Sequence, residues 1–161
     1  MTAIVDHYDL LETAAMQLVR TELVTYFPAP EETVTKSDDT MLDQGHDYFV
    51  IFYPGSFPTT KAGNQVLNVD WELIVDVMTR YDGTEPEAWA QFKAIRAEMF
   101  HLFNVLKIGR TLGGTARVLN VLLSAEERPR YVPIVPGEPN SGVAFIAQVM
   151  TVTVTEMINK V

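Results

Sequence analysis

The sequence contains no cysteine among its 161 residues. Disulfide bridges, thiolate metal ligands and cysteine nucleophiles are therefore excluded together. It also has no apolar run of about 18 residues, the length at which a membrane-spanning helix becomes a candidate. The N-terminal stretch carries Asp6, Asp9 and Glu12 and lacks the basic start and apolar region of a signal peptide. We therefore expect the protein to be located in the cytoplasm of the producing cell.

Basic residues are also few. Twelve Lys and Arg stand against 21 Asp and Glu, which gives a net charge of −9 and a pI of about 4.7. Proteins bind nucleic acid largely through Lys and Arg side chains that displace counterions from phosphates. Attraction to DNA is therefore not expected, whereas a role in which DNA must pass without sticking stays open.

Known catalytic and metal-binding patterns are missing as well. His7, His46 and His101 have no metal-ligand spacing, and His101 is interpreted as a helix-surface or core-edge residue. Residues 109–117, GRTLGGTAR, have the glycines of a phosphate loop, but they lack its Gly-Lys-Ser/Thr ending and its strand-to-helix order. We predict no catalytic residue, no metal ion and no cofactor.

What the sequence does contain is the pattern of one α+β domain, residues 1–161. Apolar residues recur with a helical period over 4–27, before Pro28, and again over 86–106. Alternating or wholly apolar segments predict strands at 47–55, 67–81, 115–125 and 143–157, with a further short strand at 131–134. Residues 31–46 are polar and are expected to be a loop or to hold a weak edge strand around 32–35. The order α-β-β-α-β-β predicts a mostly antiparallel sheet of four to five strands, with the two main helices on one face.

The long strand at 67–81 has two different faces. The residues that alternate toward the expected core are Val69, Trp71, Leu73, Val75, Val77 and Tyr81. The opposite face carries Asp70, Glu72 and Asp76, with Ile74 and Met78 among them. Carboxylates two residues apart on a strand lie roughly 6–7 Å apart, which a divalent metal could use. A solvated face or an interface is the commoner role of such a face, and both remain open here.

Apolar surface exceeds what two helices on one face can cover, so either a further element of the chain or a partner covers the other face. The segment 143–157 is apolar on both sides, and the segments 54–66 and 126–142 are long, rich in Pro and Gly, and carry lone apolar residues. Segments of this length in a compact domain tend to be functional or disordered. We therefore interpret the chain as one subunit of a larger assembly.

The succession of elements resembles a known family. The residues that carry the resemblance are the helix at 4–27, the strand YFVIFYPGS, the strand VDWELIVDVMTRYDG with the helix PEAWAQFKAIRAEMFHLF after it, and the strands ARVLNVLL and VAFIAQVMTVTVTEM. In this order and length the chain resembles the tail terminator (tail completion) proteins of long-tailed bacteriophages.

The resemblance implies a virion structural protein, located in the tail or neck and assembled in the host cytoplasm. Six copies would form a ring that caps the tail tube, stops its growth and joins it to the head-completion proteins, while DNA passes through the lumen without specific binding. Asp70, Glu72 and Asp76 would face the lumen or a subunit joint. The segments 54–66 and 126–142 would contact the tube and the connector. The candidate contact residues there are Phe57, Pro58, Lys61, Arg128, Arg130, Tyr131 and Ile134.

Three alternatives remain. The first is a neighbouring neck or head-completion subunit of the same connector. The second is a stand-alone binding or regulatory protein. The third is a small metal-dependent enzyme of α+β fold. For the acidic residues of the long strand, a solvated outer face is the alternative to a lumen or a joint.

Overall fold

The computed structural model describes residues 2–27, 29–36, 46–56, 58–63, 66–81, 86–106, 108–114, 118–126, 129–133 and 144–159. It confirms an α+β fold with two main helices and a mixed, mostly antiparallel sheet. In order, the elements are α1 (Thr2–Glu22), α2 (Pro30–Thr33), β1 (Val34–Lys36), β2 (Tyr48–Pro54), β3 (Thr59–Ala62), β4 (Val66–Tyr81), α3 (Pro86–Asn104), η2 (Gly109–Thr111), β5 (Val118–Glu126), β6 (Arg130–Pro133) and β7 (Ala144–Asn159).

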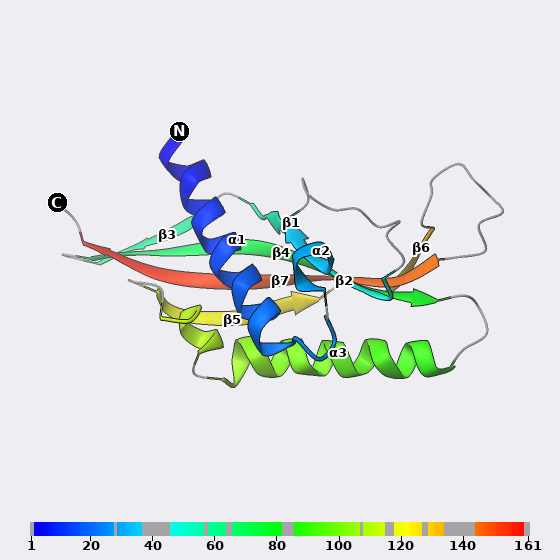
Figure 1. Cartoon of the computed structure of the whole chain (residues 1–161). Helices are drawn as coiled ribbons and strands as arrows, with labels where there is room; N and C mark the ends of the chain where they lie inside the picture. Colours follow the sequence, from blue (N-terminus) through cyan, green and yellow to red (C-terminus); the bar gives the residue numbers. More distant parts are fainter. Residues whose placement is uncertain are drawn as a thin grey trace.

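Two long strands form the centre of the sheet. β4 and β7 pair antiparallel along their whole length, from Val66 opposite Asn159 to Tyr81 opposite Ala144, and they run the length of the molecule in Figure 1. β2 and β3 both pair with the outer edge of β4, and β5 and β6 both pair with the outer edge of β7. β1 adds to β2 as a parallel strand.

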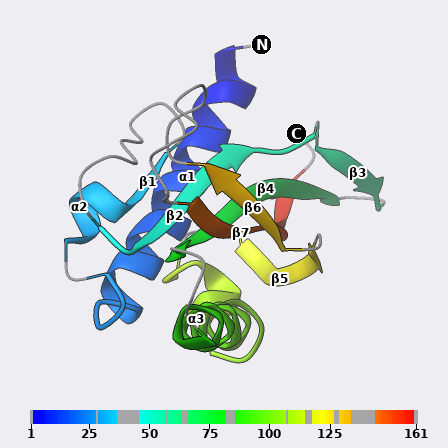
Figure 2. The same ribbon diagram turned by 90° about the vertical axis from the view of Figure 1, so that its right-hand side faces the viewer.

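Both main helices pack on the same face of this sheet. The alternating residues of β4 that were predicted to be buried, from Val69 to Val77, join one apolar core with the inner sides of α1 and α3. In the view along the sheet in Figure 2, α3 is seen end on and lies on the same side as α1. This confirms the prediction of two helices on one face. We call the opposite side of the sheet the second face.

The first turns of α1 are held against the end of the long strands. Nε2 of His7 lies 2.5 Å from Oε2 of the buried Glu156 on β7, and the His7 ring lies 4.6 Å from the ring of Trp71. Tyr8 packs edge-on against Trp71 and donates a hydrogen bond to the backbone carbonyl of Ser56. Burial raises the pKa of Tyr8, with nearby Glu72 adding to the effect.

The predicted order and strand number were incomplete. The strands formed by the described residues join into one seven-stranded sheet. Residues 59–62, expected to be part of a loop, form β3, although their side chains are exposed and their sequence, TTKA, has no apolar alternation. Residues 30–33, just before β1, form a helical turn, and the weak edge strand expected at 32–35 is β1, two residues later.

α1 also ends earlier than predicted, at Glu22 rather than near Phe27. Thr21, Val24 and Thr25 are β-branched, and such residues lose rotamer freedom in a helix. A tight turn replaces the last helical turn, with the backbone N–H of Tyr26 donating to the carbonyl of Leu23 at 3.0 Å. Within the described residues, no helix combines the length and apolar character that crossing a membrane requires.

Candidate functional site

The second face holds the residues singled out from the sequence. On β4, Asp70, Glu72, Ile74, Asp76 and Met78 alternate with the core residues and lie on this face, as the strand period predicts. Their partners on β7, from Thr155 to Ala147, are opposite them in register. We call the half of this face around Asp76 the closed half, and the half around Asp70 and Glu72 the open half.

The closed half is built around a buried ion pair. Asp76 is 5% exposed, and its Oδ2 accepts a hydrogen bond from Nη2 of Arg130 at 2.7 Å. Nη1 of Arg130 lies 3.5 Å from Oδ1 of the same carboxylate. Arg130 is on β6 opposite Ala147 of β7, so its side chain crosses β7 to reach β4. Asp76 is therefore bound within the chain and is not part of an open acidic surface.

Apolar side chains fill the space around this ion pair. Phe49, Ile51, Met78, Phe145 and Ala147 form a second, smaller core that contains no residue of α1 or α3. The rings of Phe49 and Phe145 meet edge to face, with centroids 5.5 Å apart. This cluster explains why Met78 lies among charged residues on β4.

Tyr53 borders the same apolar cluster, and its pKa depends on the nearby charges of Asp76 and Arg130. The side chain is partly buried against the cluster. Burial is the largest cause that raises the pKa of Tyr53, and the nearby Asp76 carboxylate raises it further, while Arg130 acts in the opposite direction. The phenol therefore stays neutral at pH 7.

Asp70 and Glu72 lie in the open half and are partly exposed. Oδ1 of Asp70 accepts a hydrogen bond from Thr155 Oγ1 at 2.6 Å, and Lys61 Nζ lies 3.9 Å from Oδ2. Glu72 accepts a hydrogen bond from the hydroxyl of Ser56. Among the described residues, no three His, Asp or Glu side chains gather in a way that could hold a metal ion.

The predicted contact residues are not all in one place. Pro58 is partly buried, Lys61 is on the exposed strand β3 with 82% of its side chain accessible, and Arg130 forms the ion pair with Asp76. The backbone of Tyr131 belongs to β6. Phe57, Arg128 and Ile134 lie outside the described residues.

Large apolar side chains are exposed on two different sides of the molecule. Leu122 and Met157 belong to the second face, where they lie opposite Thr153 and Asn68, and they are 46% and 38% exposed. Leu119, at the β-bulge of β5, is also exposed and lies three residues before Leu122. We call Leu119, Leu122 and Met157, together with Asp70 and Glu72, the open acidic patch.

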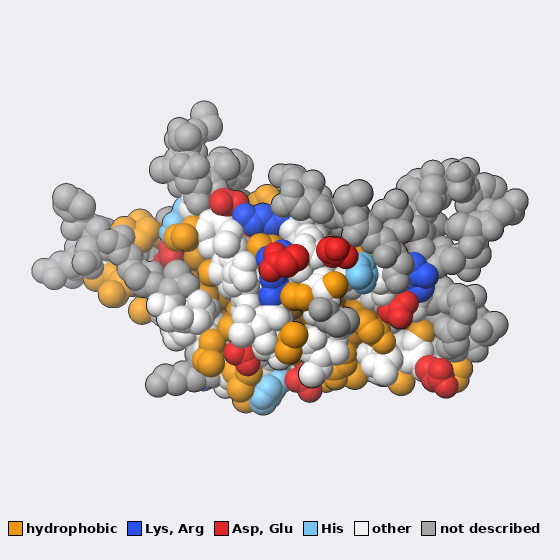
Figure 3. Space-filling model, in the orientation of Figure 1, with side chains coloured by type: hydrophobic (Ala, Val, Ile, Leu, Met, Phe, Trp, Pro, Cys, Tyr) orange, Lys and Arg blue, Asp and Glu red, His pale blue; other side chains and the backbone are white. Residues whose placement is uncertain are grey.

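The second exposed group lies on and just after α3. Phe100 and Val105 are 54% and 55% exposed, and Ile108 is also exposed. Lys93 and Arg96 precede Phe100 by seven and four residues, which places them on the same side of the helix. We call these five residues the α3 patch. Figure 3 shows the helix-covered side of the molecule, with hydrophobic side chains along its lower edge, over α3.

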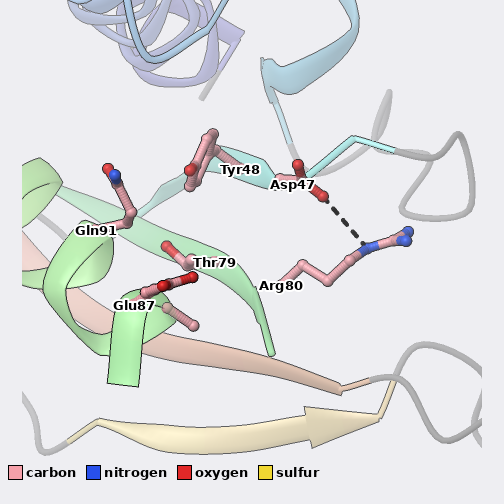
Figure 4. Close-up of a pocket in the computed structure, with 7 residues that line it drawn as sticks. Asp47, Tyr48, Thr79, Arg80, Glu87 and Gln91 are labelled. Carbon is pink, nitrogen blue, oxygen red and sulfur yellow. Dashed lines mark ion pairs between the residues drawn. The ribbon is translucent and has the colours of Figure 1, made fainter. Parts of the chain in front are cut away.

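A polar pocket lies where the ends of β2 and β4 meet the start of α3. Its volume is about 400 Å³, and the described residues that line it are Asp47, Tyr48, Thr79, Arg80, Glu87, Ala88 and Gln91. Figure 4 shows the side chains of Tyr48, Thr79, Glu87 and Gln91 around one space, with Arg80 directed toward Asp47. Sequence reasoning missed this pocket because its residues come from three separate elements with no motif among them.

Two of the three histidines contact carboxylate oxygens, and the third lies at the surface. His7 pairs with Glu156, and His46 lies 2.6 Å from a carboxylate oxygen of Glu32. His101 is exposed on α3, as predicted.

Comparison of the sequence with models of known protein families and with curated proteins gives no match.

Proposed function

We propose that this protein is a structural subunit of a bacteriophage tail, a tail terminator that caps the end of the tail tube as a ring of identical copies. The observation that carries the proposal is the presence of two unlike apolar and charged surfaces, the open acidic patch and the α3 patch, on different sides of one chain. In this role the ring stops tube growth and forms the joint to the head-completion proteins.

Ring closure explains why two different surfaces are needed. A two-fold dimer uses the same surface twice, whereas a ring joins one surface of each copy to a different surface of the next. The two patches carry charges of opposite sign, since Asp70 and Glu72 belong to one and Lys93 and Arg96 to the other. Opposite charges steer association and fix the register of an interface.

The neighbours of the acidic residues favour a subunit joint over a lumen wall. Leu122 and Met157 share the second face with Asp70 and Glu72. Exposed apolar side chains gain free energy when a partner covers them, and a water-filled lumen would leave them exposed. The net charge of −9 still keeps the ring from binding the DNA that passes through it.

Partners along the tail axis would bind to the antiparallel pair of strands that β3 forms with the first part of β4. All four residues of β3 are exposed, and β3 pairs with β4 along one edge only, with no further described strand on its other edge. An exposed strand edge is a ready site for adding a strand from another chain. We assign this edge to the tail tube protein or to a head-completion protein. A neighbouring neck subunit would use the same surfaces with different partners.

The solution mass of the purified protein, measured by light scattering over a range of concentration and salt, tests this proposal. We expect a hexamer, or a monomer–hexamer equilibrium that shifts toward monomer as salt screens the charged patches. Leu122→Ser in the open acidic patch should shift the equilibrium to monomer. Leu10→Ser is the matched control, because Leu10 is 54% exposed on α1 and belongs to neither patch. A salt-independent dimer that both variants retain would contradict the proposal.

A further inference from the structure

The polar pocket beside α3 contains a buried hydroxyl group that has no hydrogen-bond partner among the described residues. Thr79 is 2% exposed, and within the described part of the chain its Oγ1 has no hydrogen-bond partner. In Figure 4 this oxygen is directed toward the space between Tyr48, Gln91 and Glu87. A buried hydroxyl without a partner is energetically unfavourable. A ligand that bonds to it would remove that penalty.

Three further polar side chains of the pocket have no partner among the described residues. Tyr48, Glu87 and Gln91 have no hydrogen bond or ion pair with any described residue. Burial raises the pKa of Tyr48, with Asp47 and Tyr26 adding to the effect, so the phenol keeps its proton at neutral pH. The volume of about 400 Å³ falls within the range of known small-ligand sites.

The charges of the residues that line the pocket determine which class of ligand it favours. Nε of Arg80 lies 3.8 Å from Oδ1 of Asp47, and the Arg80 backbone N–H donates to the Asp47 carbonyl at 2.7 Å. Nε of Arg80 has no hydrogen bond with a described residue, so Asp47 is only a distant ion-pair partner. The carboxylates of Asp47 and Glu87 outnumber this one guanidinium, so the described lining carries a net negative charge, which favours a cationic ligand over an anionic one.

We infer that this pocket binds a guanidinium group, the head of an arginine side chain. A guanidinium is planar, permanently charged and carries five N–H donors. The pocket offers acceptors that match those donors: a carboxylate oxygen of Glu87, the Thr79 hydroxyl oxygen and the amide oxygen of Gln91. The Tyr48 ring offers a face on which such a group stacks. This site goes beyond the proposed ring and does not depend on it.

The inference is tested with two small ligands of equal size, N-acetylarginine methylamide and its neutral counterpart N-acetylcitrulline methylamide. NMR titration follows the backbone amides of residues 47–48, 79–80 and 87–91. We expect saturable shifts with the arginine ligand and at least tenfold weaker binding of the citrulline ligand. Equal binding of both ligands, or no shift of these amides with either, would overturn the inference.

Three variants connect the binding to the pocket residues. Glu87→Gln should weaken binding of the arginine ligand at least tenfold, whereas Glu98→Gln, three turns further along the exposed side of α3, should leave it unchanged. Thr79→Val should weaken binding yet keep or raise the melting temperature, because it removes a buried hydroxyl that has no partner. Unchanged affinity in Glu87→Gln and Thr79→Val would show that the ligand binds elsewhere.

The same titration distinguishes a free ligand from a protein partner. An unstructured peptide with one arginine, compared with the same peptide carrying citrulline, should shift the same amides with an affinity at least equal to that of the small ligand if the natural source is a protein side chain. Tighter binding of the small ligand than of the peptide assigns the site to a free guanidinium compound. Either result supports a guanidinium site, and binding of neither arginine form overturns it.

Discussion

Replacing Arg130 by Met tests the closed half of the second face. Methionine keeps much of the apolar stem that crosses β7 and removes only the guanidinium. Asp76, whose side chain is 7% exposed, would then be a buried carboxylate without its partner. Breaking a buried ion pair in this way typically costs 3–5 kcal/mol. Because 43% of the Arg130 side chain is accessible to water, we reduce the expected loss to about 1.5–3 kcal/mol.

The assay is urea unfolding followed by the fluorescence of Trp71 and Trp89, with the midpoint and the slope of the transition fitted together. Asp76→Asn should lose less, about 1 kcal/mol, because a half-exposed guanidinium can turn to water. Arg110→Met is the control, since Arg110 is exposed, and it should change stability by less than about 0.5 kcal/mol. A loss below about 0.5 kcal/mol in Arg130→Met would refute the assignment of a buried, stabilising ion pair.

Two further predictions concern stability. Because burial and Asp76 raise the pKa of Tyr53 in the folded state, its contribution to stability is intact below about pH 10 and is lost as pH rises beyond that value. In urea unfolding measured at pH values above about 10, Tyr53→Phe should lose less stability with rising pH than the unchanged protein, and an equal loss in both would contradict the prediction. Gly109→Ala places a Cβ 1.6 Å from the carbonyl oxygen of Leu102, whereas Gly113→Ala meets open space at a φ of +71°. We expect thermal melts to show that the free energy of unfolding falls by more than about 2 kcal/mol in Gly109→Ala and by about 1 kcal/mol in Gly113→Ala. The reverse ranking would be inconsistent with the backbone conformation around η2.

The alternation of apolar and polar residues predicted much of the fold, because burial of one face of a strand requires apolar residues at every second position of the sequence. On β4 the residues from Val69 to Val77 lie in the core as expected. β2, apolar on both sides, lies inside the sheet with Val50 in the main core and Phe49 in the smaller one. The helix start at Pro86 follows from the fixed φ of proline in a first turn.

Other features depend on contacts between distant segments and leave no such pattern in the sequence. β3 forms because the chain folds back on β4, with Thr59 opposite Asp70, and backbone pairing alone does not require apolar side chains. The contact between Asp76 and Arg130 depends on the register of β6 on β7, which pattern alone does not specify. Asp70, Glu72 and Asp76 look equivalent in sequence, yet only Asp76 is buried.

Electron microscopy of the purified protein, at concentrations where light scattering finds oligomers, tests the central claim most directly. Joining the open acidic patch of each copy to the α3 patch of the next predicts ring-shaped particles of uniform diameter, with one central opening and rotational symmetry. Leu122→Ser should abolish these rings, and Leu10→Ser should not. Compact two-fold dimers without an opening, or open filaments in place of rings, would contradict the account.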